Sequence, residues 1–522
     1  INKNYLKILT ILISTIFFIY NTYSIGISYD QIFHIENGEI RLKYLFSLGQ
    51  SEYYDILHLR YYPGLYDTIV AFLATVFPRS FYYESYNLIN FLTALAGVFG
   101  LKKVVKIFFG TQISNIFFII TILSPVYFGH FAINPKDTII ATANFWILYY
   151  VIKYLKKNSD HIRRDSSIKI GLFIGLGAGV RVLFLGTLIP LILFLFLEIF
   201  FFKKIVNNLK LKQFFNHILL IILISYVLIV LCWPNTHSNI LIQPFTIFFQ
   251  SLVDASQGVQ ASYFAGEHYK TINTPWYYLF LNFFYRVPLI YLFTFFLNFI
   301  FIKEIMKLFK LNSNFFYFFN ISIFFLLFPF LIAIFLKLKI HDGLRYFLYL
   351  IPLFNILPSI FLYYLSKELN LFYKKAIIIS LIPLFGIFLF KFIAISPYQY
   401  SYLNLANDIF LKKNSFENDY WGTSLKELIS NFSKKNDDKN FLKIATCGVN
   451  PINVKYYLKK NNIKNFSIVD LDDKFDYAIL VNRAISDNST DDNQTCYTKF
   501  LNKNTYIVVK KSFIDLSKIV EY

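Results

Sequence analysis

The chain has 522 residues, of which 56% are hydrophobic and 20% are aromatic. A soluble protein cannot bury that much apolar surface, whereas lipid can solvate it. The net charge of +20 does not indicate nucleic-acid binding here, because the lysines lie in short loops between apolar runs, as in cytoplasmic loops of membrane proteins. We therefore expect a polytopic α-helical membrane protein with no nucleic-acid partner.

The first apolar run, at about residues 8–25, follows Lys3 and Lys7. These lysines place the N-terminus inside, so the run is expected to leave the cytoplasm as the first span. It lacks a small-residue cleavage site, which favours an uncleaved span over a signal peptide. The chain opens at Ile1 and its one methionine is Met306, so an initiator residue is expected to be missing.

A polar loop from about residue 25 to 62 follows and is expected on the outer face. Asp30 comes just after the first span, and His34 lies four residues later, where both can share a helical face. A partly desolvated carboxylate at Asp30 could act as a general base toward an acceptor hydroxyl. The alternatives are a helix cap or a solvated loop acid for Asp30, and a simple interfacial role for His34.

The apolar piece at residues 63–78 is short, contains Asp67 and starts after Tyr62 with a Pro-Gly pair. If it crossed the membrane, the lysine cluster at 102–106 would fall outside, so we expect a helix lying at the outer interface. The other spans are expected at about 86–101, 112–129, 138–153, two within 168–202, then 214–232, 277–302, 315–336, 346–365 and 376–395. With the first run this gives about eleven spans.

Charged residues gather at the expected outer ends of these spans. Asp137 in Asn134-Pro135-Lys136-Asp137 either belongs to a site or caps the span that follows. Arg181 lies in an apolar turn, where it is a site residue or a carbonyl cap. Lys337, Lys339 and Arg345 break the positive-inside pattern, and basic groups there could bind a lipid phosphate or ordinary headgroups. His341, Asp342 and Arg286 belong to the same outer set. An outer segment is expected from Trp233 to Trp276, and the Gly and Pro of the stretch YFAGEHYKTINTPWYYL at 263–279 suggest a loop that could cover a cavity.

Residues 397–522 are polar with short alternating runs, which predicts a small α/β domain. Strands are expected at 441–447, 466–471, 476–482 and 505–511, and helices at 424–435 and 450–460. Cys447 and Cys496 can pair if the domain is outside the cytoplasm. A structural zinc site is not expected, because the chain has no CxxC motif or Cys/His cluster.

These pieces together resemble the C-type (GT-C) glycosyltransferase superfamily, and within it the bacterial protein-mannosyltransferase and aminoarabinose-transferase group. The resembling stretches are Asp30 after the first span, RYYPGLYD at 60–67, HFAINPKD at 130–137, GLGAGVR ending at Arg181, TPWYY at 274–278, HDGLRYFLYLIP at 341–352 and ENDYWGTSLKEL at 417–428. The resemblance implies an inverting glycosyltransferase that moves a sugar from a polyprenyl-phosphate donor to a lipid, glycan or protein acceptor on the outer face.

By this resemblance Asp30 and Asp137 match the catalytic acids of the first two outer loops, and Arg181 and Arg345 would lie near the lipid phosphate. His34, Lys136, His341 and Asp342 are the further substrate-binding candidates. Gln31 stands where many relatives have a second acid, so no cofactor is assigned and a divalent metal is left open.

The expected organisation is a transmembrane glycosyltransferase domain at 1–396, with outer loop and interface helices at 26–80, and a soluble extracytoplasmic domain at 397–522. The expected location is a bacterial inner membrane, in contact with its lipids. Two other functions remain open. One is a polysaccharide polymerase or ligase that uses lipid-diphosphate glycans, and the other is a non-enzymatic lipid or solute transporter. Transporters favour broken helices and ionisable residues at the midplane, whereas the charges here lie at outer ends.

Overall fold

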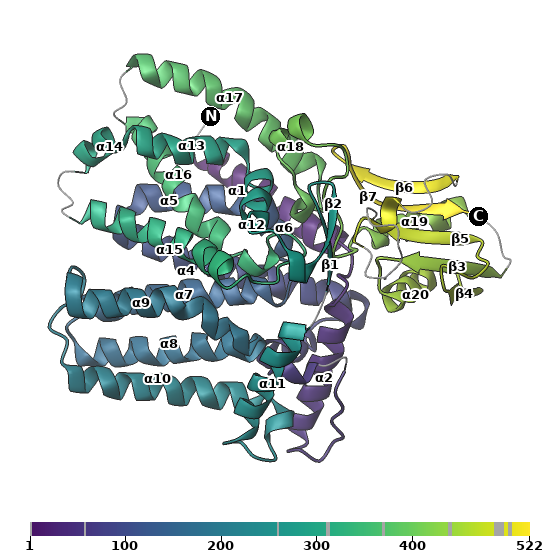
Figure 1. The fold of residues 1–522 in the computed structure, drawn as a ribbon, viewed down its shortest axis with the longest axis horizontal. Coiled ribbons are helices and arrows are strands. Elements are labelled where there is room, and N and C mark those ends of the chain that lie inside the picture. The colour runs from purple at the N-terminus through teal and green to yellow at the C-terminus, as the bar shows by residue number, and fades with distance from the viewer. Residues whose placement is uncertain are drawn as a thin grey trace.

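The computed structural model describes residues 3–56, 59–257, 260–309, 314–367, 371–436, 441–484, 495–498 and 504–522. It consists of a large helical part and a small sheet at its C-terminal end (Figure 1). Within the helical part, α8 (Asp160–Val180) packs between α7 (Asp137–Lys156) and α10 (Leu211–Leu231), and α7 packs on α4 (Tyr82–Phe109). The sheet therefore extends from one end of a bundle of long helices.

The other helices are α1 (Lys3–Ser24), α2 (Gln31–Phe46), α3 (Leu65–Ala74), α5 (Thr111–Ile122), α6 (Pro125–His130), α9 (Ile189–Leu197), α11 (Gln243–Gln257), α12 (Tyr278–Arg286), α13 (Leu289–Ile300), α14 (Ile302–Leu308), α15 (Phe315–Phe335), α16 (Leu350–Lys367), α17 (Leu371–Ala394), α18 (Leu405–Phe410), α19 (Leu425–Lys435) and α20 (Pro451–Lys460). Two 3₁₀ helices, Val182–Leu188 and Arg345–Phe347, contribute to the site described below. Most of these elements are apolar runs bounded by Pro, Gly or charged residues, which is where helices start and stop.

Helices occupy all eleven positions at which spans are expected, but the count of eleven spans is not confirmed. Among the described residues, seven helices are long and apolar enough to cross a membrane, and the number rises to eight if α12 and α13 form one span. These two helices meet at 109°, because Pro288 cannot continue a helix and Val287 is extended. Helix α5 is only 12 residues long, and α8 begins with several charged residues. The chain is a multi-pass membrane protein.

The polar loop expected after the first span contains helix α2, which packs on α3. Helix α3 has 10 residues, too few to cross about 30 Å of hydrocarbon. The two helices touch closely at Gly38, where a Cβ atom would lie 2.4 Å from the carbonyl oxygen of Asp67. The run at 63–78 is therefore a short helix fixed to the first loop.

The C-terminal sheet has the order β4-β3-β5-β7-β6. Its strands are β3 (Leu442–Cys447), β4 (Phe466–Val469), β5 (Tyr477–Val481), β6 (Thr505–Lys511) and β7 (Ile514–Glu521), and a separate hairpin is formed by β1 (Ala261–Phe264) and β2 (Glu267–Lys270). Strand β3 runs parallel to β4 and β5, while β7 runs antiparallel to β5 and β6. The four expected strands are present, but β7 was not predicted, because its buried polar residues Asp515, Ser517 and Lys518 resemble a loop.

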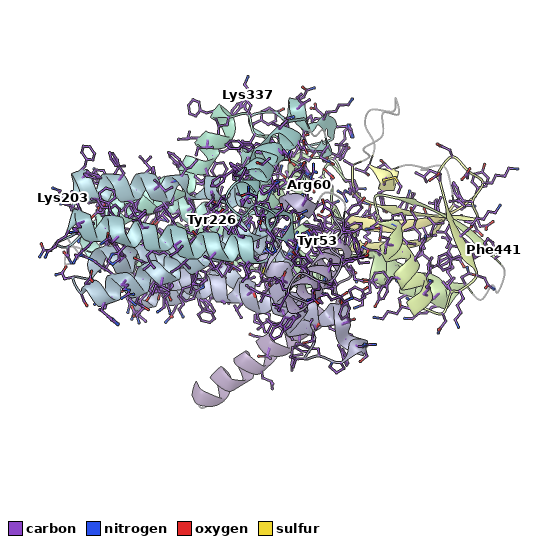
Figure 2. All side chains as sticks on the ribbon, turned by 90° about the horizontal axis from the view of Figure 1, so that it is seen from below. Tyr53, Arg60, Lys203, Tyr226, Lys337 and Phe441 are labelled. Carbon is purple, nitrogen blue, oxygen red and sulfur yellow. A yellow bond between two sulfur atoms is a disulfide. The ribbon has the colours of Figure 1, made fainter. Side chains whose placement is uncertain are left out.

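The segment between the last long helix and the sheet packs into the helical part. The amide of Asn404 donates to the carbonyl oxygens of Phe284 and Val287. Tyr400 lies against Gly129 of α6. Figure 2 shows Lys203 and Phe441 at opposite ends of the molecule, so the loop after α9 and the sheet lie far apart.

The contact at Gly129 gives a stability test. A Cβ atom at this position would lie 2.0 Å from the backbone nitrogen of Tyr400, and both partners are buried. We expect Gly129→Ala to lower the free energy of unfolding by about 2 kcal/mol, the usual cost of overpacking. The measurement is the melting temperature in detergent. Gly386→Ala, with no atom within 4 Å of the added carbon, is the control, and equal melting temperatures for both variants would contradict the packing.

Candidate functional site

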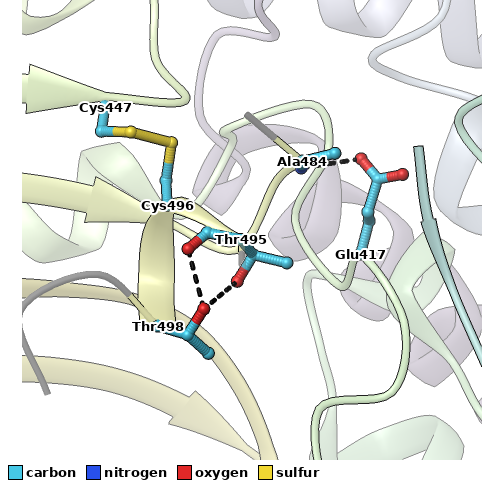
Figure 3. Close-up of a disulfide and its surroundings, with 6 residues drawn as sticks. All are labelled: Glu417, Cys447, Ala484, Thr495, Cys496 and Thr498. Carbon is cyan, nitrogen blue, oxygen red and sulfur yellow. Dashed lines mark hydrogen bonds between the residues drawn. A yellow bond between two sulfur atoms is a disulfide. The ribbon is translucent and has the colours of Figure 1, made fainter. Parts of the chain in front are cut away.

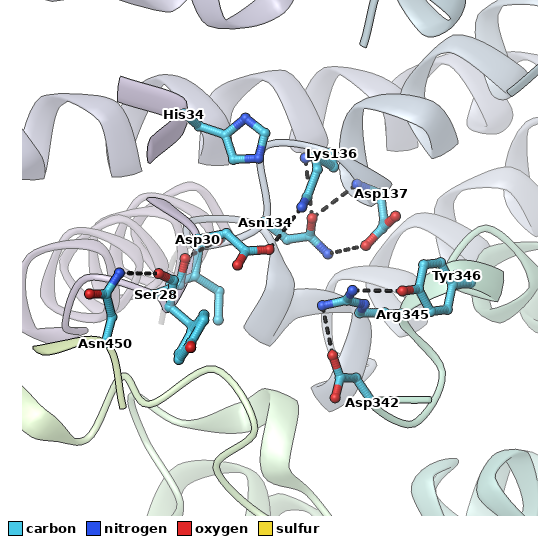
Figure 4. A network of polar contacts seen from close by, with 12 residues as sticks. Ser28, Asp30, His34, Asn134, Lys136, Asp137, Asp342, Arg345, Tyr346 and Asn450 are labelled. Carbon is cyan, nitrogen blue, oxygen red and sulfur yellow. Dashed lines mark hydrogen bonds and ion pairs between the residues drawn. The ribbon is translucent and has the colours of Figure 1, made fainter. Parts of the chain in front are cut away.

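The predicted site residues come from four segments of the chain, and Figure 4 shows the three that carry Asp30, Lys136 with Asp137, and Arg345. Asp30 lies between α1 and α2, and Lys136 and Asp137 lie at the start of α7. Arg181 ends α8, and Arg345 opens the 3₁₀ helix before α16. Segments far apart in the sequence thus contribute one charged cluster.

Asp30 does not cap a helix with its side chain, although it stands at the N-cap position of α2. Its Oδ2 instead accepts a hydrogen bond from Lys136 Nζ at 2.9 Å, and its side chain is 31% exposed. Burial raises the pKa of Asp30, but the charges of Lys136 and Arg345 outweigh it and hold that pKa well below its usual range. Asp30 is therefore ionised, and its Oδ1 makes no hydrogen bond with the described residues.

Asp137 begins α7, but Asn134 makes the capping bonds there. Asn134 Oδ1 accepts from the backbone nitrogens of Lys136 and Asp137 at 3.2 and 2.9 Å. Its Nδ2 donates to Asp137 Oδ2 at 2.9 Å and lies 3.2 Å from His130 Nδ1. Burial lowers the pKa of His130 to about 3, so the ring is neutral and its Nε2 faces the hydroxyl of Tyr420 at 2.9 Å. Asp137 is thus held by a hydrogen-bonded series of side chains that runs through Asn134 and His130 to Tyr420, in the stretch ENDYWG at 417–422.

Arg345 and Asp342 form the second ion pair of the site. Arg345 Nη1 lies 2.8 Å from Asp342 Oδ2, and its Nη2 donates to the hydroxyl of Tyr346 at 2.7 Å. Asp342 has a φ of +55°, and the next residue, Gly343, donates its backbone N–H to the hydroxyl of Tyr278. Burial raises the pKa of Asp342, but the nearby charge of Arg345 lowers that pKa by more, so the net shift is downward. Both members of the pair are therefore charged.

Arg181 is placed differently from the other basic residues. Its guanidinium lies 6.0 Å from the ring of Tyr62 and 5.7 Å from the ring of Tyr346. It makes no hydrogen bond or ion pair with the described part of the chain, and it lines a cavity. Two aromatic rings therefore orient a cation whose five N–H donors remain available for a ligand.

This cavity has a volume of about 780 Å³. Its polar lining consists of Asp137, Arg181, Thr187, Gln260, Thr271, Lys337, Lys339, His341 and Tyr346. The remainder is mostly apolar and comes from Val182–Leu188, α9, α15 and the segment before α16. Leu252 of α11 also contributes, so the segment between Trp233 and Trp276 borders the cavity. A largely apolar pocket with Arg181, Lys337 and Lys339 in its lining fits a ligand with a hydrocarbon chain and an anionic head.

Some predicted site residues lie outside this cavity lining. His34 is buried, and its Nδ1 lies 2.8 Å from Asp67 Oδ2. Arg286 is also buried and donates to the carbonyl oxygens of Tyr400 and Glu417, a structural role. Asp30, Lys136, Asp342 and Arg345 lie next to the cavity without being among its lining residues. His341 lines it as a neutral ring, because burial lowers its pKa to about 4.

Sequence reasoning missed the aromatic residues that connect these charges. Tyr62 lies beside Arg181 and also 5.6 Å from Lys136 Nζ, and Tyr346 joins Arg181 to Arg345. The chain has 40 tyrosines, so composition gave no reason to select these two, although both lie in stretches that carry the resemblance. Among the residues that the structure describes, no group of three or more His, Cys, Asp or Glu side chains could hold a metal ion.

The Asp30–Lys136 pair predicts a measurable change in protonation. The Lys136→Met variant lacks the charge that most strongly lowers the pKa of Asp30. Burial would then dominate, so the pKa of Asp30 should rise. Carbodiimide, which reacts with protonated carboxyl groups, should then label Asp30 at pH 6 in this variant and not in the wild type. Mass spectrometry of the labelled peptide gives the result. Lys337→Met, which removes a lysine that does not contact Asp30, should behave as wild type, and equal labelling in all three proteins would contradict the pairing.

Comparison with known proteins gives matches in structure alone. No protein-family model matches the chain, and no curated protein sequence matches it. ArnT from Cupriavidus metallidurans in the apo state aligns over 99% of this chain and 98% of its own, with 9% identity and a TM-score of 0.52. The same protein bound to undecaprenyl phosphate aligns over the same shares, with 10% identity and a TM-score of 0.52.

An oligosaccharyltransferase from Archaeoglobus fulgidus aligns over 87% of this chain and 66% of its own, with 11% identity and a TM-score of 0.41. The two ArnT alignments cover both the helical part and the C-terminal sheet. They confirm the resemblance at the level of the fold. The chain has the fold of ArnT over nearly its whole length.

Proposed function

We propose that the chain is a membrane glycosyltransferase that moves a sugar from a polyprenyl-phosphate donor to an acceptor hydroxyl. The observation that carries this proposal is the cavity, in which apolar walls accompany a guanidinium that has no protein partner among the described residues. The hydrocarbon chain of the donor would occupy the apolar part, and its phosphate would bind Arg181. The ArnT structure that shares this fold is bound to undecaprenyl phosphate, which supports the same ligand class here.

The charged cluster provides the groups that an inverting transfer needs. The bond between the sugar C1 and the phosphate oxygen breaks, and the acceptor oxygen bonds to C1 from the opposite face. Arg181, with Lys337 and Lys339 along the cavity, stabilises the charge that develops on the leaving phosphate. Arg345 is already paired with Asp342, so its contribution to the phosphate is weaker than that of Arg181.

Asp30 is the proposed base. Its Oδ2 is held by Lys136, and its Oδ1 remains available for an acceptor hydroxyl. A carboxylate with a lowered pKa is a weak base, so it takes the proton late, as the new C–O bond makes the hydroxyl acidic. Asp137, in the cavity lining, would act on the donor side, where it can orient the sugar.

The membrane orientation forms part of the proposal. Helix α14 and the loop containing Lys203 are rich in lysine and lie at the end of the bundle opposite the sheet (Figures 1 and 2). The positive-inside rule then places the sheet and the charged cluster outside the cytoplasm. A disulfide between Cys447 and Cys496 supports an oxidising compartment for the sheet. We infer a bacterial inner-membrane enzyme with an extracytoplasmic site.

The function can be tested with purified protein in proteoliposomes. A panel of undecaprenyl-phosphate monosaccharides is supplied with cell-envelope lipids as acceptors, and released undecaprenyl phosphate is measured. We expect turnover with at least one monophosphate-linked donor, and a loss of at least about 100-fold in Asp30→Asn, because a general base contributes that much. Asp55→Asn, an exposed acid of the same loop, is the control. Near-normal turnover in Asp30→Asn would remove Asp30 from the mechanism, and activity with diphosphate-linked donors alone would replace the proposed donor.

Arg181 predicts an effect on donor binding. Charge-assisted hydrogen bonds to a phosphate contribute enough that Arg181→Met should weaken binding of undecaprenyl phosphate roughly 10- to 100-fold. Binding is measured by microscale thermophoresis in detergent. Arg164→Met removes an exposed arginine near the other end of α8 and should leave binding unchanged. If both variants bind equally well, the phosphate does not lie at Arg181.

A further inference from the structure

The segment just before Asp30 is bound by residues from the far end of the chain. Residues 26–28 belong to no helix or strand. The backbone N–H of Ile27 donates to the hydroxyl of Tyr457 at 2.8 Å. The backbone N–H of Tyr29 donates to the carbonyl oxygen of Trp421, also at 2.8 Å. Two amide side chains complete the set. Asn453 Nδ2 donates to the carbonyl oxygen of Ser28 at 3.2 Å. Asn450 Nδ2, drawn in Figure 4, donates to the carbonyl oxygen of Tyr29 at 3.3 Å.

Packing reinforces these hydrogen bonds. Ile25 and Ile27 are 3% and 2% exposed and belong to the hydrophobic cluster that contains Trp421 and the core residues of the sheet domain. At Gly26, a Cβ atom would lie 2.3 Å from the carbonyl oxygen of Thr423, so a larger residue does not fit. The end of the first span is therefore part of the core of the C-terminal domain.

A disulfide lies close in sequence to residues that bind this segment. Cys447 ends β3, and Asn450 caps α20 three residues later. On the other side, Cys496 donates its backbone N–H to the carbonyl oxygen of Arg483 at 2.9 Å. The guanidinium of Arg483 lies 4.2 Å from the ring centre of Tyr29, the residue next to Asp30. Figure 3 shows Cys447 and Cys496 joined close to Ala484, which donates to Glu417.

We propose that the C-terminal sheet domain positions Asp30 for the reaction, with Asn450, Asn453 and Tyr457 holding residues 27–29 and the Cys447–Cys496 disulfide fixing these groups. The helical part holds Asp30 through the ion pair with Lys136, and it holds Ser28 through a hydrogen bond from the Ser28 hydroxyl to the carbonyl oxygen of Ile133. The domain adds the contacts to the backbone of residues 27–29, directly before Asp30. Contacts from both sides fix the place and the direction of the carboxylate, which a base needs toward its acceptor. This inference rests on the proposed function for its effect on turnover.

The first test uses two neighbouring tyrosines of α20. Tyr457→Phe removes the acceptor for Ile27 and keeps the ring, whereas Tyr456→Phe changes a tyrosine that packs on Tyr83 instead. We expect Tyr457→Phe to lower kcat about tenfold or more, since small misplacements of reacting groups have effects of this size. Its KM for the donor should change little, because the cavity is untouched. Amide hydrogen exchange at residues 27–29 should speed up in Tyr457→Phe and not in Tyr456→Phe.

The second test uses the disulfide in the full-length protein. Reduction of the folded wild type with a phosphine should speed amide exchange at residues 27–29 and lower kcat, while binding of undecaprenyl phosphate stays unchanged. The Cys447→Ser/Cys496→Ser double variant should behave like the reduced protein and no longer respond to the phosphine. Cys232→Ser, which removes the remaining free cysteine, should keep the response of the wild type.

The two proposals fail in different ways. If the wild type turns over no donor, the proposed function fails, and the contact between the domain and residues 27–29 is still tested by amide exchange. If the wild type is active and Tyr457→Phe keeps its kcat and its exchange rates, the positioning role is overturned. Equal losses in kcat and in undecaprenyl phosphate binding would also overturn it, because they would indicate general damage to the fold.

Discussion

The ion pair between Asp30 and Lys136 is the contact on which the candidate site depends. It joins the segment between α1 and α2 to the start of α7, at a place where Lys136 is buried and the Asp30 side chain is 31% exposed. An isolated charge there would be costly, so each acid of the cluster is matched by a nearby cation or hydrogen-bond donor. Asp342 is matched by Arg345, and Asp137 by Asn134. The nearby cations keep Asp30 and Asp342 ionised at the edge of an apolar bundle.

Much of this arrangement could be predicted from the sequence, because membrane proteins make charge and hydrophobicity unusually informative. Apolar runs gave the positions of the long helices, and the exceptions to the positive-inside pattern selected Arg345 and the cavity lysines. The number of crossings could not be obtained in the same way. Hydropathy alone does not show that Pro288 bends α12 and α13 into a sharp corner, nor that α8 begins as a charged helix.

The hydrogen-bond and ion-pair partners of individual residues could not be predicted from the sequence, for a different reason. His34 was a candidate for substrate binding, and in the structure its ring is hydrogen-bonded to Asp67. In the sequence, Asp67 served only as an argument that the run at 63–78 does not cross the membrane. Strand β7 was missed because its place inside the sheet, between β5 and β6, and not its composition, makes it a strand. The hydrogen bonds from α20 to residues 27–29 connect positions more than 400 residues apart. Neither spacing nor periodicity carries information at that distance without related sequences.

The charge balance of the site bears on how the proposed reaction is driven. Lys136, Arg181 and Arg345 balance Asp30, Asp137 and Asp342, and Lys337 and Lys339 of the cavity lining add two positive charges. A polyprenyl-phosphate sugar is a phosphodiester with a single negative charge, whereas the departing polyprenyl phosphate gains a second one. In the proposed reaction, the basic groups of the cavity would bind the leaving phosphate more strongly than the donor, and this difference would lower the barrier. The same preference would slow release of the lipid product. If the chemical step is fast, product release limits the rate, and the cavity lysines would then lower turnover.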